Sequence, residues 1–171
     1  GRRFPPHQEI VAKGEPTREA SILYSGWACR VRQFADGRRQ ILGIILPGDT
    51  IGMCWEREPR EVTTIVALTE AVLYRAPRAP PDGGLAEAYA MSSALEVASM
   101  YRHIARLGRL SAYERVTDWL LEIRDRLVAA RLGEVDTFPM PLTQELLADV
   151  LGLTSVHVNR TLQALRREGL V

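Results

Sequence analysis

The side chains with the most distinctive chemistry lie near the end of the chain, in a segment that reads GLTSVHVNRTLQALRREGL from position 152. Val158, Leu162 and Leu165 recur at helical spacing in this segment, which predicts one buried face. The opposite face carries short hydrogen-bonding residues and then arginines: Ser155, His157, Asn159, Arg160, Gln163 and Arg167. An exposed helix normally mixes Glu with Lys, whereas the first turn of this one holds no carboxylate.

This polar face suits contact with DNA. A helix that enters the major groove, about 12 Å wide, needs short side chains that reach base edges and no carboxylates beside phosphates. Arg160 lies one turn further along and can donate two hydrogen bonds to guanine O6 and N7. The alternative is that Arg160 forms a surface ion pair with Glu145 or Asp149 of the preceding segment.

The elements around this segment predict a helix-turn-helix. Thr143 can cap a short helix, QELLADVLG, which Gly152 ends, and Thr154 or Ser155 can cap the last helix. Upstream, the SAYE sequence at 111–114 has the form of a capping box and starts a further helix that ends near Gly133.

A long helix is predicted between Leu85 and Leu110, where no proline occurs. One apolar stripe has the 4-3-4-3 spacing of a coiled coil: Ala90, Ala94, Val97, Tyr101 and Ile104. A second stripe lies beside it: Met91, Leu95, Ala98 and Ala105. We expect one stripe to pack against the strands of its own chain and the other against the same helix of a second copy. Burial within a monomeric core is the alternative.

Residues 19–76 read as short strands separated by turns such as ADG and PGD, which predicts an antiparallel sandwich or barrel. A cluster of prolines and glycines between 77 and 84 then breaks the pattern. The sequence therefore predicts three parts: a barrel over 1–84, a dimerisation helix over 85–110 and a helical DNA-binding domain over 111–171.

Composition narrows the functional classes. The net charge of +1 and the 46% hydrophobic content are ordinary for a globular protein, and no apolar run is long enough to span a membrane. The two cysteines, Cys29 and Cys54, favour a reduced, cytoplasmic setting. The strand region contains no histidine, which argues against a metalloenzyme on a cupin-like barrel. We therefore expect no enzymatic activity.

In chain order these segments resemble the Crp/Fnr family of bacterial transcription regulators. The segment LTQELLADVLGLTSVHVNRTLQALRREGLV resembles its helix-turn-helix, and SGWACRVRQFADGRRQILGIILPGD resembles its cyclic-nucleotide-binding-type jelly roll. The resemblance implies an α+β fold: an N-terminal antiparallel jelly-roll barrel, a long dimerisation helix and a C-terminal winged helix-turn-helix whose wing is expected after Val171. It also implies a homodimer on a palindromic operator in double-stranded DNA, with RNA polymerase as a further candidate partner.

The resemblance also assigns site residues. The family reads bases mainly at the positions of Ser155, Val156 and Arg160, and we add Asn159. Because many members have Arg-Glu at the first two positions, the operator need not be that of the best-known members. The resemblance matches Thr143, Gln144 and Thr154 to positions that contact phosphate, and we add His157. The dimer interface is assigned from the coiled-coil stripe instead: Ala90, Ala94, Val97, Tyr101 and Ile104.

The effector is not identified by the sequence. Cyclic-nucleotide binders of the family carry a Gly-Glu and an Arg-Ser/Thr-Ala cassette, but here Met53 replaces the Glu and Glu61 follows Arg60 where a phosphate would lie. We therefore do not expect cAMP binding, nor an iron–sulfur cluster, because two cysteines are too few for one. We expect Cys29 to be a small buried residue, and Cys54 to be either buried or a redox thiol. An adaptor that uses the barrel and the terminal helices for protein contacts, without DNA, is the alternative function.

Overall fold

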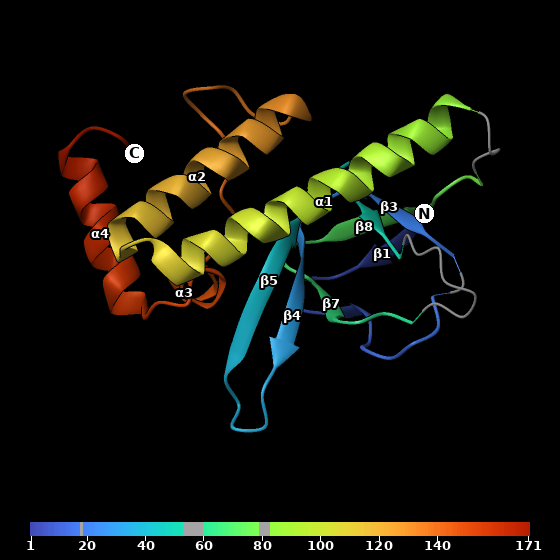
Figure 1. The fold of residues 1–171 in the computed structure, drawn as a ribbon, viewed down its shortest axis with the longest axis horizontal. Coiled ribbons are helices and arrows are strands. Elements are labelled where there is room, and N and C mark those ends of the chain that lie inside the picture. The colour runs from blue at the N-terminus through green and yellow to red at the C-terminus, as the bar shows by residue number, and fades with distance from the viewer. Residues whose placement is uncertain (18, 53–59, 79–82) are drawn as a thin grey trace. The chain divides into compact units, whose positions relative to one another are not determined.

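The computed structural model describes residues 1–17, 19–52, 60–78 and 83–171 (Figure 1). The chain divides into two compact units. The first comprises Gly1–Arg32 and Leu42–Tyr101, and the second comprises Gln33–Ile41 and Arg102–Val171. None of the helices in the described ranges combines the length and the apolar character that a membrane-spanning helix requires.

The described part of the chain forms two four-stranded antiparallel sheets, with strand orders β1-β8-β3-β6 and β2-β7-β4-β5. The strands are β1 (Arg2–Phe4), β2 (Glu9–Val11), β3 (Ser21–Ser25), β4 (Ala28–Gln33), β5 (Arg39–Ile45), β6 (Thr50–Ile51), β7 (Thr64–Ala67) and β8 (Ala71–Arg75). This topology confirms the jelly-roll type of fold. The structure also adds two strands to the predicted region, because β1 and β2 come before residue 19.

The first unit has its core between the inward faces of the strands. Leu23, Ile65 and Ala71 are fully buried there, and alternate residues along β7 and β8 point inward. Gly26 joins β3 to β4 with a positive φ of 85°, and a Cβ there would lie 2.1 Å from the Glu70 carbonyl oxygen. Only glycine fits this turn.

The long helix α1 (Gly84–Arg109) forms as predicted, but its packing differs from the prediction. The members of both apolar stripes are exposed, so neither stripe packs on the strands of its own chain. Within the first unit the helix makes its contacts through another face, on which Tyr89 is buried. The Tyr89 hydroxyl donates to the Pro77 carbonyl (2.8 Å), and the Ser92 and Thr50 hydroxyls lie 3.1 Å apart. The expectation was wrong because polar side chains, spaced along a third face, supply these contacts.

In the second unit α1 is followed by α2 (Ala112–Ala129), α3 (Gln144–Leu151) and α4 (Ser155–Arg167). The capping box is confirmed: Ser111 accepts from the Glu114 amide, and the Glu114 carboxylate accepts from the Ser111 amide (2.8 Å). The core of this unit comes from α2, α3 and α4: Val116, Trp119, Ile123, Leu127, Leu151, Val158 and Leu165.

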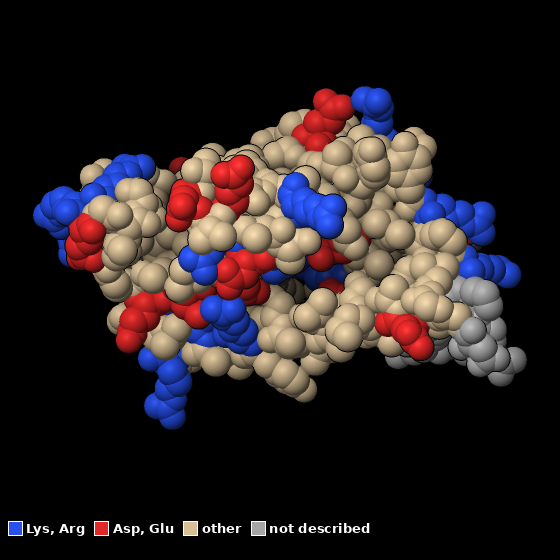
Figure 2. Space-filling model, turned by 90° about the horizontal axis from the view of Figure 1, so that it is seen from above, with Lys and Arg blue, Asp and Glu red and all other residues tan. Residues whose placement is uncertain are grey.

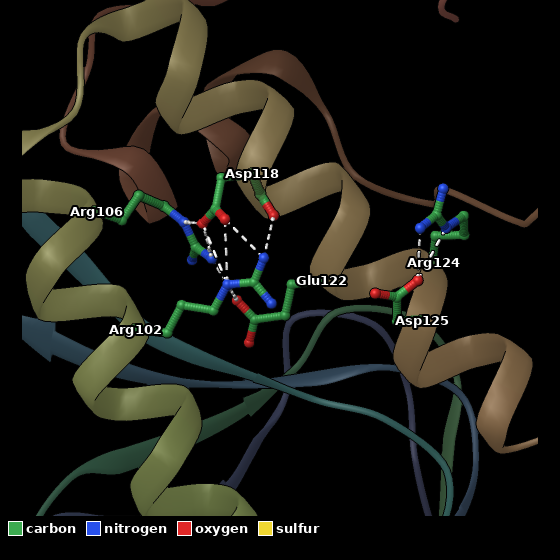
Figure 3. A network of polar contacts seen from close by, with 6 residues as sticks. All are labelled: Arg102, Arg106, Asp118, Glu122, Arg124 and Asp125. Atoms are coloured by element: carbon green, nitrogen blue, oxygen red, sulfur yellow. Dashed lines mark hydrogen bonds and ion pairs between the residues drawn. The ribbon is translucent and has the colours of Figure 1, made fainter.

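An ion-pair network joins the end of α1 to α2, and Figure 3 shows its two arginines reaching toward two carboxylates. Arg106 is 2% exposed, lies 2.6 Å from Asp118 and also pairs with Glu122. Arg102 pairs with the other Asp118 oxygen at 2.6 Å. Burial raises the pKa of Asp118, but the hydrogen bonds from the two arginines outweigh it, so this pKa lies below its usual value. The network therefore links the last turns of α1 to α2 by paired charges.

Candidate nucleic-acid interface

The turn between α3 and α4 is built from local signals. Thr143 caps α3 by accepting from the Leu146 amide (3.2 Å), and Thr154 caps α4 by accepting from the His157 amide (3.3 Å). Gly152 ends α3 in the left-handed conformation, with φ of 60° and ψ of 39°. Two short helices joined at this glycine form the predicted helix-turn-helix.

The exposed side of α4 forms one wall of an open groove. Its lining comes from α4 and the first residue of α3: Gln144, Ser155, Val156, Asn159, Arg160, Gln163 and Arg167. The groove therefore brings together all four residues predicted to read bases and one predicted to contact phosphate. The sequence predicts Gln163 and Arg167 on the polar face but gives no reason to assign them a contact with DNA. Their spacing of four residues, from Asn159 to Gln163 and on to Arg167, is the pattern that places them along the same groove.

The buried side of α4 differs slightly from the prediction. Val158 and Leu165 are buried, whereas Leu162 is only half-buried and Thr161 is buried in its place. The helix phase is unchanged, so the polar face points outward as expected.

Arg160 is available for a ligand. Asp149, one of its two predicted alternative partners, pairs instead with Arg39, whose Nε lies 2.5 Å from the Asp149 carboxylate. Within the described ranges Arg160 forms no ion pair and no hydrogen bond, and it is exposed. The surface-pair alternative for Arg160 is therefore wrong.

Two other predicted residues do have partners. The Asn159 amide donates to the Gln144 side-chain oxygen at 3.0 Å, which links the two helices across the groove. The His157 ring lies over the N-terminus of its helix, with Nδ1 3.2 Å from the Thr154 hydroxyl. Each of these side chains retains further hydrogen-bonding groups that face outward.

Charge is unevenly placed on this protein. The face that Figure 2 shows carries basic and acidic side chains interspersed, with no single large basic patch. The last turn of α4 is basic, with Arg166 and Arg167, and its first turn has no acidic residue. Contact with a polyanion therefore depends on where the charges lie, since the net charge is only +1.

Comparison with known proteins assigns both parts of the chain. A family model for the Crp-like helix-turn-helix domain matches residues 114–171, and one for the cyclic nucleotide-binding domain matches residues 1–80. The nitrogen fixation regulation protein FixK of Bradyrhizobium diazoefficiens is 37% identical over 100% of this chain and 74% of its own length. Its counterpart in Azorhizobium caulinodans is 32% identical over 98% of this chain and 69% of its own length. The solved structure of FixK2 from Bradyrhizobium japonicum superposes with a TM-score of 0.82 at 29% identity, over 98% of this chain and 84% of that one.

The chain belongs to the Crp/Fnr family. It is therefore a DNA-binding transcription regulator, and the groove along α4 is its helix-turn-helix surface.

Glu61 and Arg60, from the segment compared above with the family's cyclic-nucleotide cassette, lie among the described residues. Glu61 is 7% exposed, accepts from Arg30 (3.2 Å) and from the Thr63 hydroxyl (3.2 Å), and so places a buried carboxylate there. Arg60 donates to the Gly14 carbonyl at 2.9 Å instead of facing an anion. These residues do not fit a cyclic phosphate. Met53 and Cys54 lie outside the described residues; Cys29 is buried, as expected.

The stripe assigned to the dimer interface of this Crp/Fnr member lies on the surface of α1. Val97 is 41% exposed, Ile104 66% and Tyr101 70%, and Ala90 and Ala94 are exposed beside them. The second stripe adds Met91 and Leu95, each 62% exposed. We call this combined surface the α1 apolar face.

Proposed function

We propose that the protein acts as a homodimer that binds a palindromic operator in double-stranded DNA. In this proposal α4 enters the major groove, Ser155, Val156, Asn159 and Arg160 contact bases, and Thr143, Gln144, Thr154 and His157 contact phosphate. The observation that carries the proposal is the exposed Arg160, which has no partner among the described residues and lies in a groove whose lining contains no carboxylate.

Two of the phosphate assignments have chemical support. The Thr143 oxygen already accepts a backbone hydrogen bond, so its hydroxyl hydrogen remains available to donate to a phosphate oxygen. Gln144 uses its oxygen toward Asn159, which leaves its amide hydrogens for the same purpose. These groups sit at helix N-termini, where the helix dipole also favours an anion.

The α1 apolar face supports the dimer. Several large apolar side chains are exposed on one helix at coiled-coil spacing, and a surface of this kind is stable in water when a second copy covers it. A two-fold dimer would place two copies of α4 about one helical turn of DNA apart, roughly 34 Å.

Regulation and location follow from the family. Because the FnrL protein of Cereibacter sphaeroides is named a transcriptional activator, we propose that this protein also activates transcription, with RNA polymerase as a partner, in the cytoplasm. We also propose that cAMP is not its effector, because the buried carboxylate of Glu61, paired with Arg30, disfavours an anion beside it.

Selection of operators from random double-stranded DNA tests the proposal. The wild type is expected to enrich an inverted repeat, and Arg160→Ala to lose preference at one base pair in each half-site, at a cost of about 1–3 kcal/mol per half-site. Arg124→Ala is the matched control, because Arg124 is paired with Asp125 on α2, outside the groove. Absence of any enriched inverted repeat would contradict the proposal, and uniform weakening on all sequences would reduce Arg160 to a phosphate contact.

A further inference from the structure

The carboxyl end of α3 is completed by residues from outside the helix. The last four carbonyls of a helix have no partner within it, and the last turn of α3 contains no basic residue. The Ala148 carbonyl accepts from the backbone after the helix, including the Leu153 amide at 3.1 Å. The next two carbonyls, of Asp149 and Val150, accept from the Gln40 side-chain amide at 2.8 and 3.1 Å.

The last carbonyl of α3 is satisfied from α2. Arg115 donates to the Leu151 carbonyl at 3.2 Å, and the same guanidinium donates to the Leu107 carbonyl of α1 at 2.8 Å. All four carbonyls at this end therefore have hydrogen-bond partners. Gln40 is the partner of two of these carbonyls, although it lies 109 residues before Asp149 in the sequence.

Gln40 belongs to the tip of the β4–β5 hairpin, residues Gln33–Ile41, which forms part of the second unit. Two neighbours fix this tip further. Arg39 pairs with Asp149 at 2.5 Å, and the Ile41 backbone hydrogen-bonds to buried His103 on α1. The hairpin tip thus contacts the backbone and a side chain of α3 directly before the Gly152 turn.

We propose that the hairpin tip 33–41 is part of the DNA-reading apparatus, with Gln40 as a positioning residue that fixes the end of α3 and so the direction of α4. This inference rests on the proposed function. β4 and β5 continue from the tip into the first unit, so the tip is joined to the strands there at both of its ends.

The chemistry of the contact defines a graded set of variants. A donor is required, because carbonyl oxygens with the partial negative charge of a helix end surround the Gln40 amide. Gln40→Lys keeps a donor and adds a favourable charge, Gln40→Met removes the donor at similar volume, and Gln40→Glu brings a carboxylate against the carbonyls. Arg38→Ala is the matched control, because Arg38 lies in the same hairpin but pairs only locally, with Asp36.

The test measures amide hydrogen exchange and DNA affinity on the full chain. Exchange of the amides of residues 150–158 is expected to be about tenfold faster in Gln40→Met and faster still in Gln40→Glu, with wild-type rates in Gln40→Lys and Arg38→Ala. Affinity for the selected operator should fall in the same order, while the α1 apolar face still gives a dimer. A folding defect would be recognised by faster exchange throughout α2 as well, and restoration in Gln40→Lys excludes it.

A charge exchange provides an independent arm. Arg39→Asp and Asp149→Arg are each expected to weaken operator binding, and the double variant to recover most of it. Unchanged exchange at 150–158 in Gln40→Met would overturn the inference, and so would faster exchange with unchanged operator affinity. If the wild type selects no operator, the proposed function fails, but the exchange measurement still decides whether Gln40 holds α3.

Discussion

Val156 gives the sharpest test of how the groove reads sequence. Its side chain is 63% exposed in the first turn of α4, and an apolar side chain in that position makes no favourable interaction with water. The C5-methyl group of thymine is the apolar feature of the major groove, and it is absent from uracil. We predict that each half-site contains a thymine whose methyl packs against Val156.

The expected size of this effect follows from the area of one methyl group. Burial of such a group is worth about 0.8 kcal/mol, so replacement of the critical thymine by uracil in both half-sites should cost about 1.6 kcal/mol, close to fifteenfold in Kd. Val156→Ala should show a smaller difference in affinity between the two operators, because most of the side chain that packs against the methyl is removed.

Fluorescence anisotropy with four combinations, wild type and Val156→Ala on thymine and uracil operators, measures this coupling directly. Substitution of a thymine outside the half-sites is the control and should leave the Kd unchanged. If uracil weakens the variant as much as the wild type, or weakens neither, Val156 does not contact a thymine methyl and the assignment fails.

Three further predictions concern the rest of the chain. Val97→Glu and Ile104→Glu should each give monomers in analytical ultracentrifugation, because an unpaired charge would enter the dimer interface. The control Leu121→Glu, on α2, should stay dimeric. Dimers of the first two variants would contradict the proposed α1 interface. Millimolar cAMP should leave the Tm unchanged, and a clear rise would show that the native state binds it. Burial, aided by the Arg106 charge, lowers the pKa of His103, so the unfolded chain binds a proton that the folded chain does not. Stability should therefore fall as the pH drops below about 6.5, and urea titrations at successive pH values should show a smaller fall for His103→Gln; identical profiles would refute this origin.

Local sequence signals predicted the parts of the fold that depend on neighbouring residues. The threonine caps, the capping box at Ser111 and the left-handed Gly152 each act within one helical turn, and all three form as expected. The short strand β1 was missed, because three residues are too few to show alternation and its pairing is with β8, near the other end of the unit.

The contacts that the sequence could not predict join residues far apart in the chain. Nothing in the local sequence distinguishes Gln40 from any polar residue of a hairpin, and its function appears only when the end of α3 lies beside it. The packing of α1 was misjudged for a related reason. Two apolar stripes suggested two apolar contacts, whereas Ser92 and Glu96 face the strands and hold the helix through hydrogen bonds and charge.

The Arg30 guanidinium has a consequence for how this protein can evolve. It lies 3.2 Å from the buried Glu61 carboxylate and 2.7 Å from Glu96 on α1, so one cation holds two anions together. Loss of Arg30 alone would leave those two carboxylates facing each other without a counter-charge, a step that selection should reject. A substitution of Glu61 or Glu96 by a neutral residue therefore has to precede the loss of Arg30 or accompany it. Among orthologues we therefore expect these three positions to change together, so that a lineage that recovers an anion-binding pocket must first lose the carboxylate at 61.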